Sequence, residues 1–284
     1  MDPVSGDPKH PIAVFASGLG GRTVLHECLV WLPHEDFVYL GDSARFPYGD
    51  RPADDLRERS LAVARRLAGD GAKMIVIACN AATSAALDAL RREFGDAMPV
   101  VGMVEPAARQ AAAATRNGRV GLLATSATVA SGSYERALAA AGPQLELHQV
   151  ACPKLAPLIQ SGAALDPRVV DLVDEYCAPL LEAGVDTVVL GCTHYPLVRA
   201  VLHRALGRDV ALVSSGQAIA DEVERHLAGL GIGNDTGRRG TYRLACTGDQ
   251  DEFGRLAALS LQLPVDRVDR IEIAEAAATG IRAA

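Results

Sequence analysis

Residues 74–83, MIVIACNAAT, and residues 187–196, TVVLGCTHYP, each carry an apolar run that ends at a cysteine followed by a polar residue. A continuous apolar run predicts a strand buried on both faces, as in a parallel sheet covered by helices. Ligands of open α/β sheets gather at the carboxyl ends of the strands, where Cys79 and Cys192 stand. We therefore expect the two thiols to face one pocket. Two such groups can move a proton from one face of a carbon to the other.

The rest of the chain alternates short apolar segments with amphipathic helical patterns. This order predicts the α/β class, with mostly parallel sheets flanked by helices, because each parallel return needs a crossover. The expected strands are 12–15, 37–40, 74–78, 100–104, 120–124, 145–150, 187–190, 211–213 and 242–245. The expected helices include 53–69, 83–94, 132–141, 167–183, 196–206, 217–230 and 251–261.

A weak internal repeat divides the chain into two similar halves. Residues 11–18, PIAVFASG, resemble residues 119–126, RVGLLATS, and the two cysteine-bearing strands resemble each other. A duplicated α/β unit places Cys79 and Cys192 at equivalent strand ends. The repeat therefore predicts two similar domains with a site in the cleft between them.

Composition limits the kinds of partner. The chain has 284 residues, 49% of them hydrophobic, and a formal net charge of −7 with no basic tract. Nucleic acid is therefore not expected as a ligand. Apolar runs are too short to span a membrane, so no membrane association is expected. Residues 1–10 are expected to form a disordered tail rather than a signal peptide, which favours a cytoplasmic location.

The chain offers little to hold a cofactor or a metal. Lysine occurs only at Lys9, Lys73 and Lys154, none in a convincing Schiff-base position, so pyridoxal phosphate is not expected. Cys192 and His194 lack a second ligand pair, so a metal is not expected either. The other cysteines form no CxxC motif and are interpreted as reduced and structural: Cys28, Cys152, Cys177 and Cys246.

Polar residues at strand ends suggest a binding site. The glycine-rich turn at 17–21 follows a strand, and its backbone amides could bind a small anion; a dinucleotide is less favoured because Thr23 replaces the third glycine of that fingerprint. The helix that follows Cys79 is expected to lower the pKa of its thiol. The turn Pro47-Tyr48-Gly49 offers backbone amides and a phenol hydroxyl.

Together these motifs resemble the glutamate racemases of the aspartate/glutamate racemase superfamily over almost the whole chain. The matching landmarks are Ser17-Gly18 with Gly20-Gly21, Gly41 to Arg45 with Pro47-Tyr48-Gly49, Ala78-Cys79-Asn80, Glu105-Pro106, Ser131-Gly132 with Tyr134, Cys152-Pro153, and Gly191 to Pro196.

The resemblance implies a fold, a reaction and a set of site residues. It implies one domain of residues 11–104 plus 214–284, and a second domain, 105–213, inserted in the first. It further implies racemisation of an acidic amino acid without a cofactor, D-glutamate production for peptidoglycan, and frequent homodimers. The catalytic residues expected are Cys79, Cys192 and His194, and the substrate-binding residues Ser17, Pro47, Tyr48, Gly49, Asn80 and Thr193.

Three positions depart from the family pattern. Ala16 stands where an aspartate is usual, Ala81 replaces a threonine expected to bind substrate carboxylate, and Gln160 replaces a glutamate. Since a carboxylate near each thiol is thought to assist its proton transfer, both thiols lack a usual helper. Two alternatives to glutamate racemisation therefore stay open: a racemase, epimerase or isomerase for another small acid, and a catalytically weak homologue that binds a partner.

Overall fold

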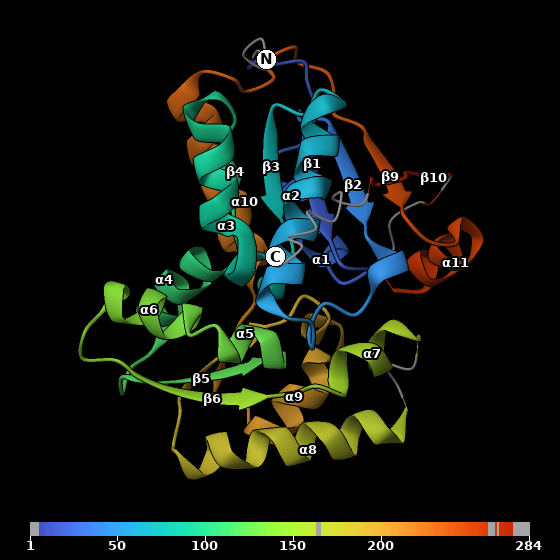
Figure 1. Ribbon diagram of the computed structural model, residues 1–284. Coiled ribbons are helices and arrows are strands. Elements are labelled where there is room, and N and C mark those ends of the chain that lie inside the picture. The colour runs from blue at the N-terminus through green and yellow to red at the C-terminus, as the bar shows by residue number, and fades with distance from the viewer. Residues whose placement is uncertain (1–5, 163–165, 261–264, 266, 275–284) are drawn as a thin grey trace, which may run out of the picture.

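The computed structural model describes residues 6–162, 166–260, 265 and 267–274 (Figure 1). Two sheets form its centre, and every strand pairing in both is parallel. The first has the order β10-β9-β2-β1-β3-β4 and the second the order β6-β5-β7-β8. The α/β class with two helix-flanked parallel sheets is thus confirmed.

The first sheet contains β1 (Ile12–Ala16), β2 (Phe37–Gly41), β3 (Met74–Ile77), β4 (Val100–Val101), β9 (Tyr242–Cys246) and β10 (Val268–Arg270). The second contains β5 (Arg119–Ala124), β6 (Glu146–Ala151), β7 (Thr187–Gly191) and β8 (Ala211–Val213). The helices are α1 (Arg22–Trp31), α2 (Ala53–Gly69), α3 (Asn80–Phe94), α4 (Val104–Ala114), α5 (Ser126–Ala130), α6 (Ser133–Ala141), α7 (Leu155–Gln160), α8 (Pro167–Glu182), α9 (Arg199–Leu206), α10 (Ser215–Leu230) and α11 (Gln250–Ser260). Short 3₁₀ turns lie at Ser43–Arg45, Gly95–Ala97 and Tyr195–Val198.

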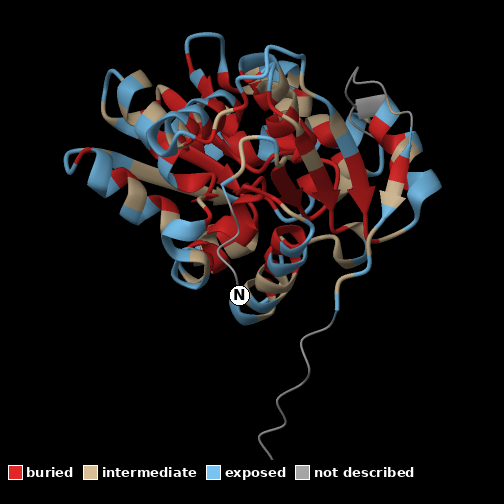
Figure 2. Ribbon diagram, turned by 90° about the horizontal axis from the view of Figure 1, so that it is seen from above, coloured by how far each residue is buried: buried red, intermediate tan, exposed pale blue. Residues whose placement is uncertain are grey.

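The two sheets share one topology. The series β2-β1-β3-β4 in the first corresponds to β6-β5-β7-β8 in the second. The pairs β1/β5 and β3/β7 are the ones that the sequence repeat links. In Figure 1 the second sheet, with α8 and α9, lies below the first. The strands are largely buried, as Figure 2 shows, because helices cover both faces of each sheet.

The chain enters the second sheet and then returns to the first. Strands β1 to β4 and β9 to β10 belong to the first sheet, while β5 to β8 form the second. The domain boundaries expected near residues 104 and 213 fall in the segments that connect the sheets and stay a prediction. Residues 1–5 of the expected tail lie outside the described part. Residues 6–10 contain a turn in which the His10 amide donates to the Asp7 carbonyl at 2.9 Å, and the disorder expected for the tail stays a prediction.

Three local expectations need correction. Val104 was expected in a strand, yet it begins α4, because Pro106 is well placed in the first turn of a helix. Helix α3 begins at Asn80, three residues earlier than expected, so it starts directly after Cys79. Strand β10 was not predicted, since its three residues carry too little pattern to stand out.

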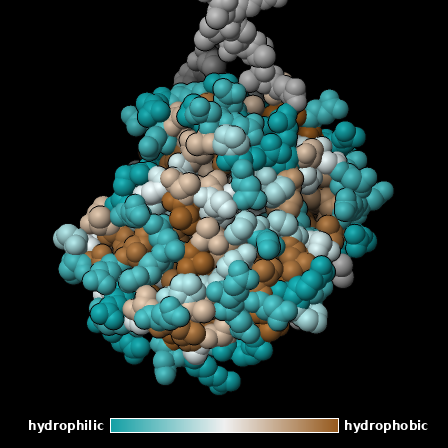
Figure 3. Space-filling view, turned by 60° about the horizontal axis from the view of Figure 1, so that its bottom comes forward, coloured by the Kyte–Doolittle hydropathy of each residue, from teal (hydrophilic) through white to brown (hydrophobic). Residues whose placement is uncertain are grey.

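Among the helices of the described residues, none combines the length and the apolar character that a membrane crossing requires. On the face that Figure 3 shows, hydrophobic residues lie in separate groups among hydrophilic ones.

Candidate active site

The nine residues expected at the site line one small cavity between the two sheets. They come from the ends of three strands, β1, β3 and β7, and from the loop after β2. The cavity is lined by Ser17, Phe46, Pro47, Tyr48, Gly49, Asp50, Cys79, Asn80, Ala81, Thr125, Pro153, Ala156, Pro157, Gly191, Cys192, Thr193 and His194. Its location matches the expected interdomain site, while the roles of the individual residues stay predictions.

The cavity is closed in this conformation. Its volume is about 30 Å³, room for only one or two water molecules. Cys79 and Cys192 are each 8% exposed and Asn80 is 3% exposed. A substrate must therefore be admitted by movement of the walls.

A larger groove lies elsewhere on the molecule. It has a volume of about 910 Å³ and is bordered by α3, α4 and α6. Its lining contains no cysteine or histidine in the part of the chain that the structure describes. We place the chemistry in the smaller cavity, because that is where both thiols lie.

Cys79 lies two residues after the end of β3 and directly before the first residue of α3. Burial raises its pKa, although hydrogen bonds from the Ala82 amide, from Ser17 and from the Ala81 amide act in the opposite direction. The expectation that the helix start would lower this pKa is therefore wrong on balance, since loss of hydration outweighs the amide dipoles.

The Cys192 thiol occupies the equivalent position after β7. Burial raises its pKa to about 12, opposed by the His194 amide and reinforced by the neighbouring Cys79. The Sγ atom lies 3.6 Å from His194 Nδ1. Burial also lowers the pKa of His194 to about 4, so the imidazole is neutral at pH 7. Both thiols are protonated at rest, and a neutral base stands beside one of them.

The glycine-rich turn receives side chains of the second domain rather than a small anion. A Cβ at Gly20 would lie 2.5 Å from His194 Nδ1, and a Cβ at Gly18 would lie 2.5 Å from the Gln160 amide. The Leu19 amide donates to Gln160 Oε1 at 3.0 Å. The expected anion site is thus filled, and the glycines serve close approach between the domains.

Tyr48 is held by a buried carboxylate. Its hydroxyl donates to Asp42 Oδ2 at 2.5 Å, and Arg59 donates to both Asp42 oxygens at 2.7 and 2.8 Å. Burial acts to raise the pKa of Asp42, but hydrogen bonds from Arg59, Tyr48 and Thr247 lower it on balance. The Tyr48 hydroxyl, expected to be offered to the ligand, is therefore committed to Asp42.

Asn80 links the two domains and keeps one donor open. Tyr134 of α6 donates to Asn80 Oδ1 at 2.7 Å. The buried Asn80 Nδ2 has no hydrogen-bond partner among the described residues. Because a buried donor without a partner is costly, this amide is suited to a ligand acceptor in the cavity.

The sequence did not predict that Thr125 lines the cavity or that Gln160 contacts Leu19 and His194. Thr125 follows β5 as Ser17 follows β1, and the repeat between residues 11–18 and 119–126 was the signal that could have found it. The three departures lie differently: Ala81 lines the cavity, Gln160 contacts His194, and Ala16 is buried at the end of β1 outside the lining.

Comparison with known proteins agrees with this architecture. The family model for Asp/Glu/hydantoin racemases matches residues 31–223. A glutamate racemase of Beutenbergia cavernae is 46% identical over 274 residues, covering 93% of this chain and 94% of that protein.

Solved structures of glutamate racemases are similar to this chain. A glutamate racemase isoform from Bacillus anthracis gives a TM-score of 0.88 at 34% identity, covering 93% of this chain and 98% of that one. The enzyme from Francisella tularensis, in complex with D-glutamate, gives 0.86 at 26% identity, covering 94% and 98%. The chain belongs to the Asp/Glu/hydantoin racemase family, within the group of the glutamate racemases.

Proposed function

We propose that the chain interconverts L- and D-glutamate without a cofactor, using Cys79 and Cys192 as the two proton-transfer groups. The observation that carries this proposal is the pair of buried thiols at equivalent strand ends of two similar sheets, lining one closed cavity. Membership of the glutamate racemase group supports the same reaction. D-glutamate would supply peptidoglycan synthesis.

The reaction needs one thiolate and one thiol. The thiolate removes the α-proton from one face of the substrate and becomes a thiol, while the opposite thiol donates its proton to the other face and becomes a thiolate. Burial holds both pKa values high, so the reactive thiolate is formed inside the closed site rather than stored at rest. Exclusion of water strengthens each charge interaction there.

Several donors could hold the substrate carboxylates. The open Asn80 Nδ2 suits a carboxylate oxygen, and the Ser17, Thr125 and Thr193 hydroxyls line the same cavity. The bound D-glutamate in the Francisella tularensis relative supports an acidic amino acid as ligand. We assign Pro47, Tyr48 and Gly49 to the wall against which it lies.

Cytoplasmic location and a homodimer belong to the same proposal. Both rest on the resemblance to glutamate racemases. Nucleic acid and membranes are not proposed as partners.

A second candidate is the same two-thiol chemistry on another small acid. Ala81 offers a methyl group to the cavity where the family has a hydroxyl, which weakens recognition of a carboxylate. The third hypothesis is a weak catalyst with a partner-binding role. It is supported by the absence of carboxylates at positions 16 and 160.

One experiment separates the three readings. The protein is incubated in D₂O with L-glutamate, then with L-aspartate and a panel of other amino acids, and loss of the α-proton signal is followed by NMR. Fastest exchange with glutamate supports the proposal. Faster exchange with another acid favours the second candidate, and no exchange with any of them would overturn the enzyme assignment.

A further inference from the structure

A second groove lies beside the closed cavity and shares two lining residues with it. This α7–α11 groove lies between α7, α11 and the turn Ser43–Arg45, and its volume is about 410 Å³. Phe46 and Pro157 line both the groove and the cavity. The larger groove at α3, α4 and α6 shares no lining residue with the cavity in the described part of the chain. Phe46 and Pro157 therefore form a partition between an outer groove and the space that holds both thiols.

The two halves of this partition come from different sheets. Phe46 follows β2 of the first sheet, and Pro157 lies in α7, between β6 and β7 of the second. Both residues are half-buried. The ring centre of Phe46 lies 5.7 Å from that of His194, so this ring meets the cavity on its inner side. Rotation of the Phe46 ring, or a small separation of the two sheets, would join the groove to the cavity.

The loop that carries Phe46 is anchored on both sides of this residue. The Ala44 amide donates to Thr247 Oγ1 at 3.1 Å, and the Tyr48 hydroxyl donates to Asp42. The Phe46 side chain has no polar atom that a hydrogen bond could hold. Rotation of a partly exposed side chain is faster than movement of a loop. Rotation of the Phe46 ring is therefore the simplest way to open the partition while the loop keeps its place.

The α7–α11 groove has an acidic rim. Asp249 and Glu252 line the groove and are exposed, whereas its lining residues Phe253 and Leu256 are buried. Among the described residues, the lining contains no lysine, arginine or histidine. Glutamate carries a net negative charge near neutral pH, so this rim repels it. The charge at residue 252 should therefore influence the rate at which an acidic amino acid enters.

We propose that an amino-acid substrate reaches the two thiols through the α7–α11 groove, and that Phe46 and Pro157 form the gate between groove and cavity. The inference rests on the proposed reaction at Cys79 and Cys192. It explains how a cavity of about 30 Å³ receives a substrate much larger than itself. With the gate closed, both thiols are shielded from water, as their exposure of 8% shows.

Alkylation of the thiols tests the gate without any need for turnover. The full-length protein is treated with iodoacetamide, and mass spectrometry of its peptides gives a rate for each cysteine. Phe46→Ala should raise the rates at Cys79 and Cys192 by about 10-fold or more, because an open partition lets the reagent reach them. Cys28 and Cys177 are 0% exposed and lie outside the cavity lining, so their rates should stay constant unless the variant unfolds.

Phe46→Trp supplies the opposite change. Its larger ring should slow the alkylation of Cys79 and Cys192, and this variant decides the question if Phe46→Ala does not fold. Wild-type rates at both thiols in a folded Phe46→Ala protein, or in Phe46→Trp where the alanine variant is unfolded, would overturn the gate.

A charged reagent tests the route. Iodoacetate is an anion of nearly the same size as iodoacetamide, so the ratio of their rates at the two thiols reports the charge along the path. Glu252→Lys should raise this ratio by about 3-fold at low salt, and high salt should remove the gain. Glu182→Lys makes the same change of charge at the end of α8 away from α7 (Figure 1) and should leave the ratio unchanged.

Another path would give a different result. The exposed residues Asp50 and Pro153 also line the cavity, and entry beside them would leave the ratio in Glu252→Lys at its wild-type value. That outcome would overturn the α7–α11 route. Failure of the proposed function is distinguishable, because the alkylation rates would change as expected in a protein that turns over no glutamate.

Discussion

At the level of single residues, Cys79 and Cys192 occupy equivalent positions in the two sheets, but different groups surround their thiols. Cys79 receives hydrogen bonds from Ser17 and from the first amides of α3, whereas Cys192 has the His194 ring beside it. Within the part of the chain that the structure describes, the main causes of the two pKa shifts do not include a carboxylate. We therefore expect the two halves of the proposed reaction to depend on different supporting groups.

The effect of having Ala16 where the family has an aspartate can be tested by placing an aspartate at this position. Ala16→Asp should raise the kcat for glutamate by about 10²-fold, the lower end of the effect of a positioned acid–base group. Ala16→Asn, of the same size and without charge, is the matched control and should give no such gain. If the aspartate variant folds as stably as the wild type and turns over no faster, this pocket has been rebuilt for another substrate.

Burial of His194 makes stability depend on pH. Its pKa falls from 6.5 to about 4 on folding, so the unfolded chain binds the proton more tightly between these values. Stability is therefore lost as pH falls through this window, by about 2 kcal/mol between pH 7 and pH 5 from this group. Denaturant unfolding at pH 7 and pH 5 measures the loss in the free energy of unfolding. This loss should be smaller in His194→Gln than in the wild type by this amount. Equal losses in the two proteins would contradict the lowered pKa of His194.

At the level of helices and strands, the sequence predicted where the strands end. It did not predict the contacts between residues far apart in the chain. Apolar runs ending in Cys79 and Cys192 predicted β3 and β7, and the internal repeat predicted that the carboxyl ends of these two strands face one cleft. Nothing local indicates that Gln160 reaches Leu19, which lies 141 residues away. Such contacts depend on how the two domains pack against each other. This packing produces no periodic pattern of hydrophobic residues in either segment, so the sequence does not reveal it.

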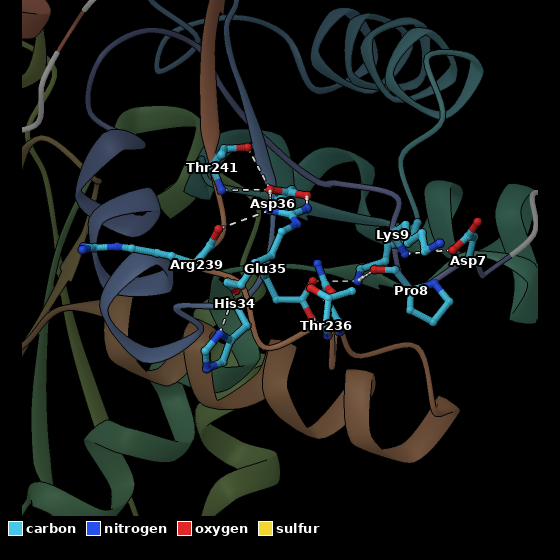
Figure 4. Close-up of polar contacts among 12 residues, drawn as sticks. Asp7, Pro8, Lys9, His34, Glu35, Asp36, Thr236, Arg239 and Thr241 are labelled. Atoms are coloured by element: carbon cyan, nitrogen blue, oxygen red, sulfur yellow. Dashed lines mark hydrogen bonds and ion pairs between the residues drawn. The ribbon is translucent and has the colours of Figure 1, made fainter.

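A buried ion pair fastens several connecting segments to the first sheet. Lys73 Nζ lies 2.6 Å from Glu35 Oε2 and also donates to the carbonyls of Pro8 and Ile232 at 2.7 and 2.8 Å. The Asn234 amide donates to Glu35 Oε1 at 2.7 Å. Figure 4 shows Glu35 and Pro8 in this cluster, next to the Asp36–Thr241 hydrogen bonds. Lys73, which the sequence does not place in a cofactor site, has a structural role in these contacts.

Removing one partner of this pair should be costly. Lys73→Met leaves the buried Glu35 carboxylate without its cation and should reduce the free energy of unfolding by about 3–5 kcal/mol. Arg65→Met breaks the exposed Arg65–Glu93 pair and should cost no more than about 1 kcal/mol. Chemical denaturation of both variants measures these losses. Similar losses in the free energy of unfolding for the two variants would show that the Lys73–Glu35 pair does not stabilise the fold more than an exposed pair does.

At the scale of the whole molecule, two similar domains enclose a cavity smaller than their substrate. We therefore expect the walls of the cavity to open when a substrate enters, and the contacts that bridge the cavity to contribute to substrate binding. The sequence repeat predicted two facing domains. It could not predict how tightly they close, because closure depends on contacts such as Tyr134 to Asn80.

The Tyr134–Asn80 contact offers a test of closure. Tyr134→Phe leaves the buried Asn80 Oδ1 without its donor and should raise the KM for glutamate about 10-fold with little change in kcat, since it weakens positioning and not proton transfer. Tyr176→Phe in α8, outside the cavity lining, is the control and should leave KM unchanged. A fall in kcat at constant KM would argue against a binding role for the contact.

We propose that the two thiols share one proton-transfer reaction, and this can be measured directly. NMR in D₂O follows both α-proton loss and inversion of L- and D-glutamate for the wild type, Cys79→Ser, Cys192→Ser and the remote control Cys177→Ala. We expect inversion with deuterium incorporation in the wild type and the control, and no inversion in either serine variant. Inversion at the wild-type rate in Cys79→Ser or Cys192→Ser would contradict it.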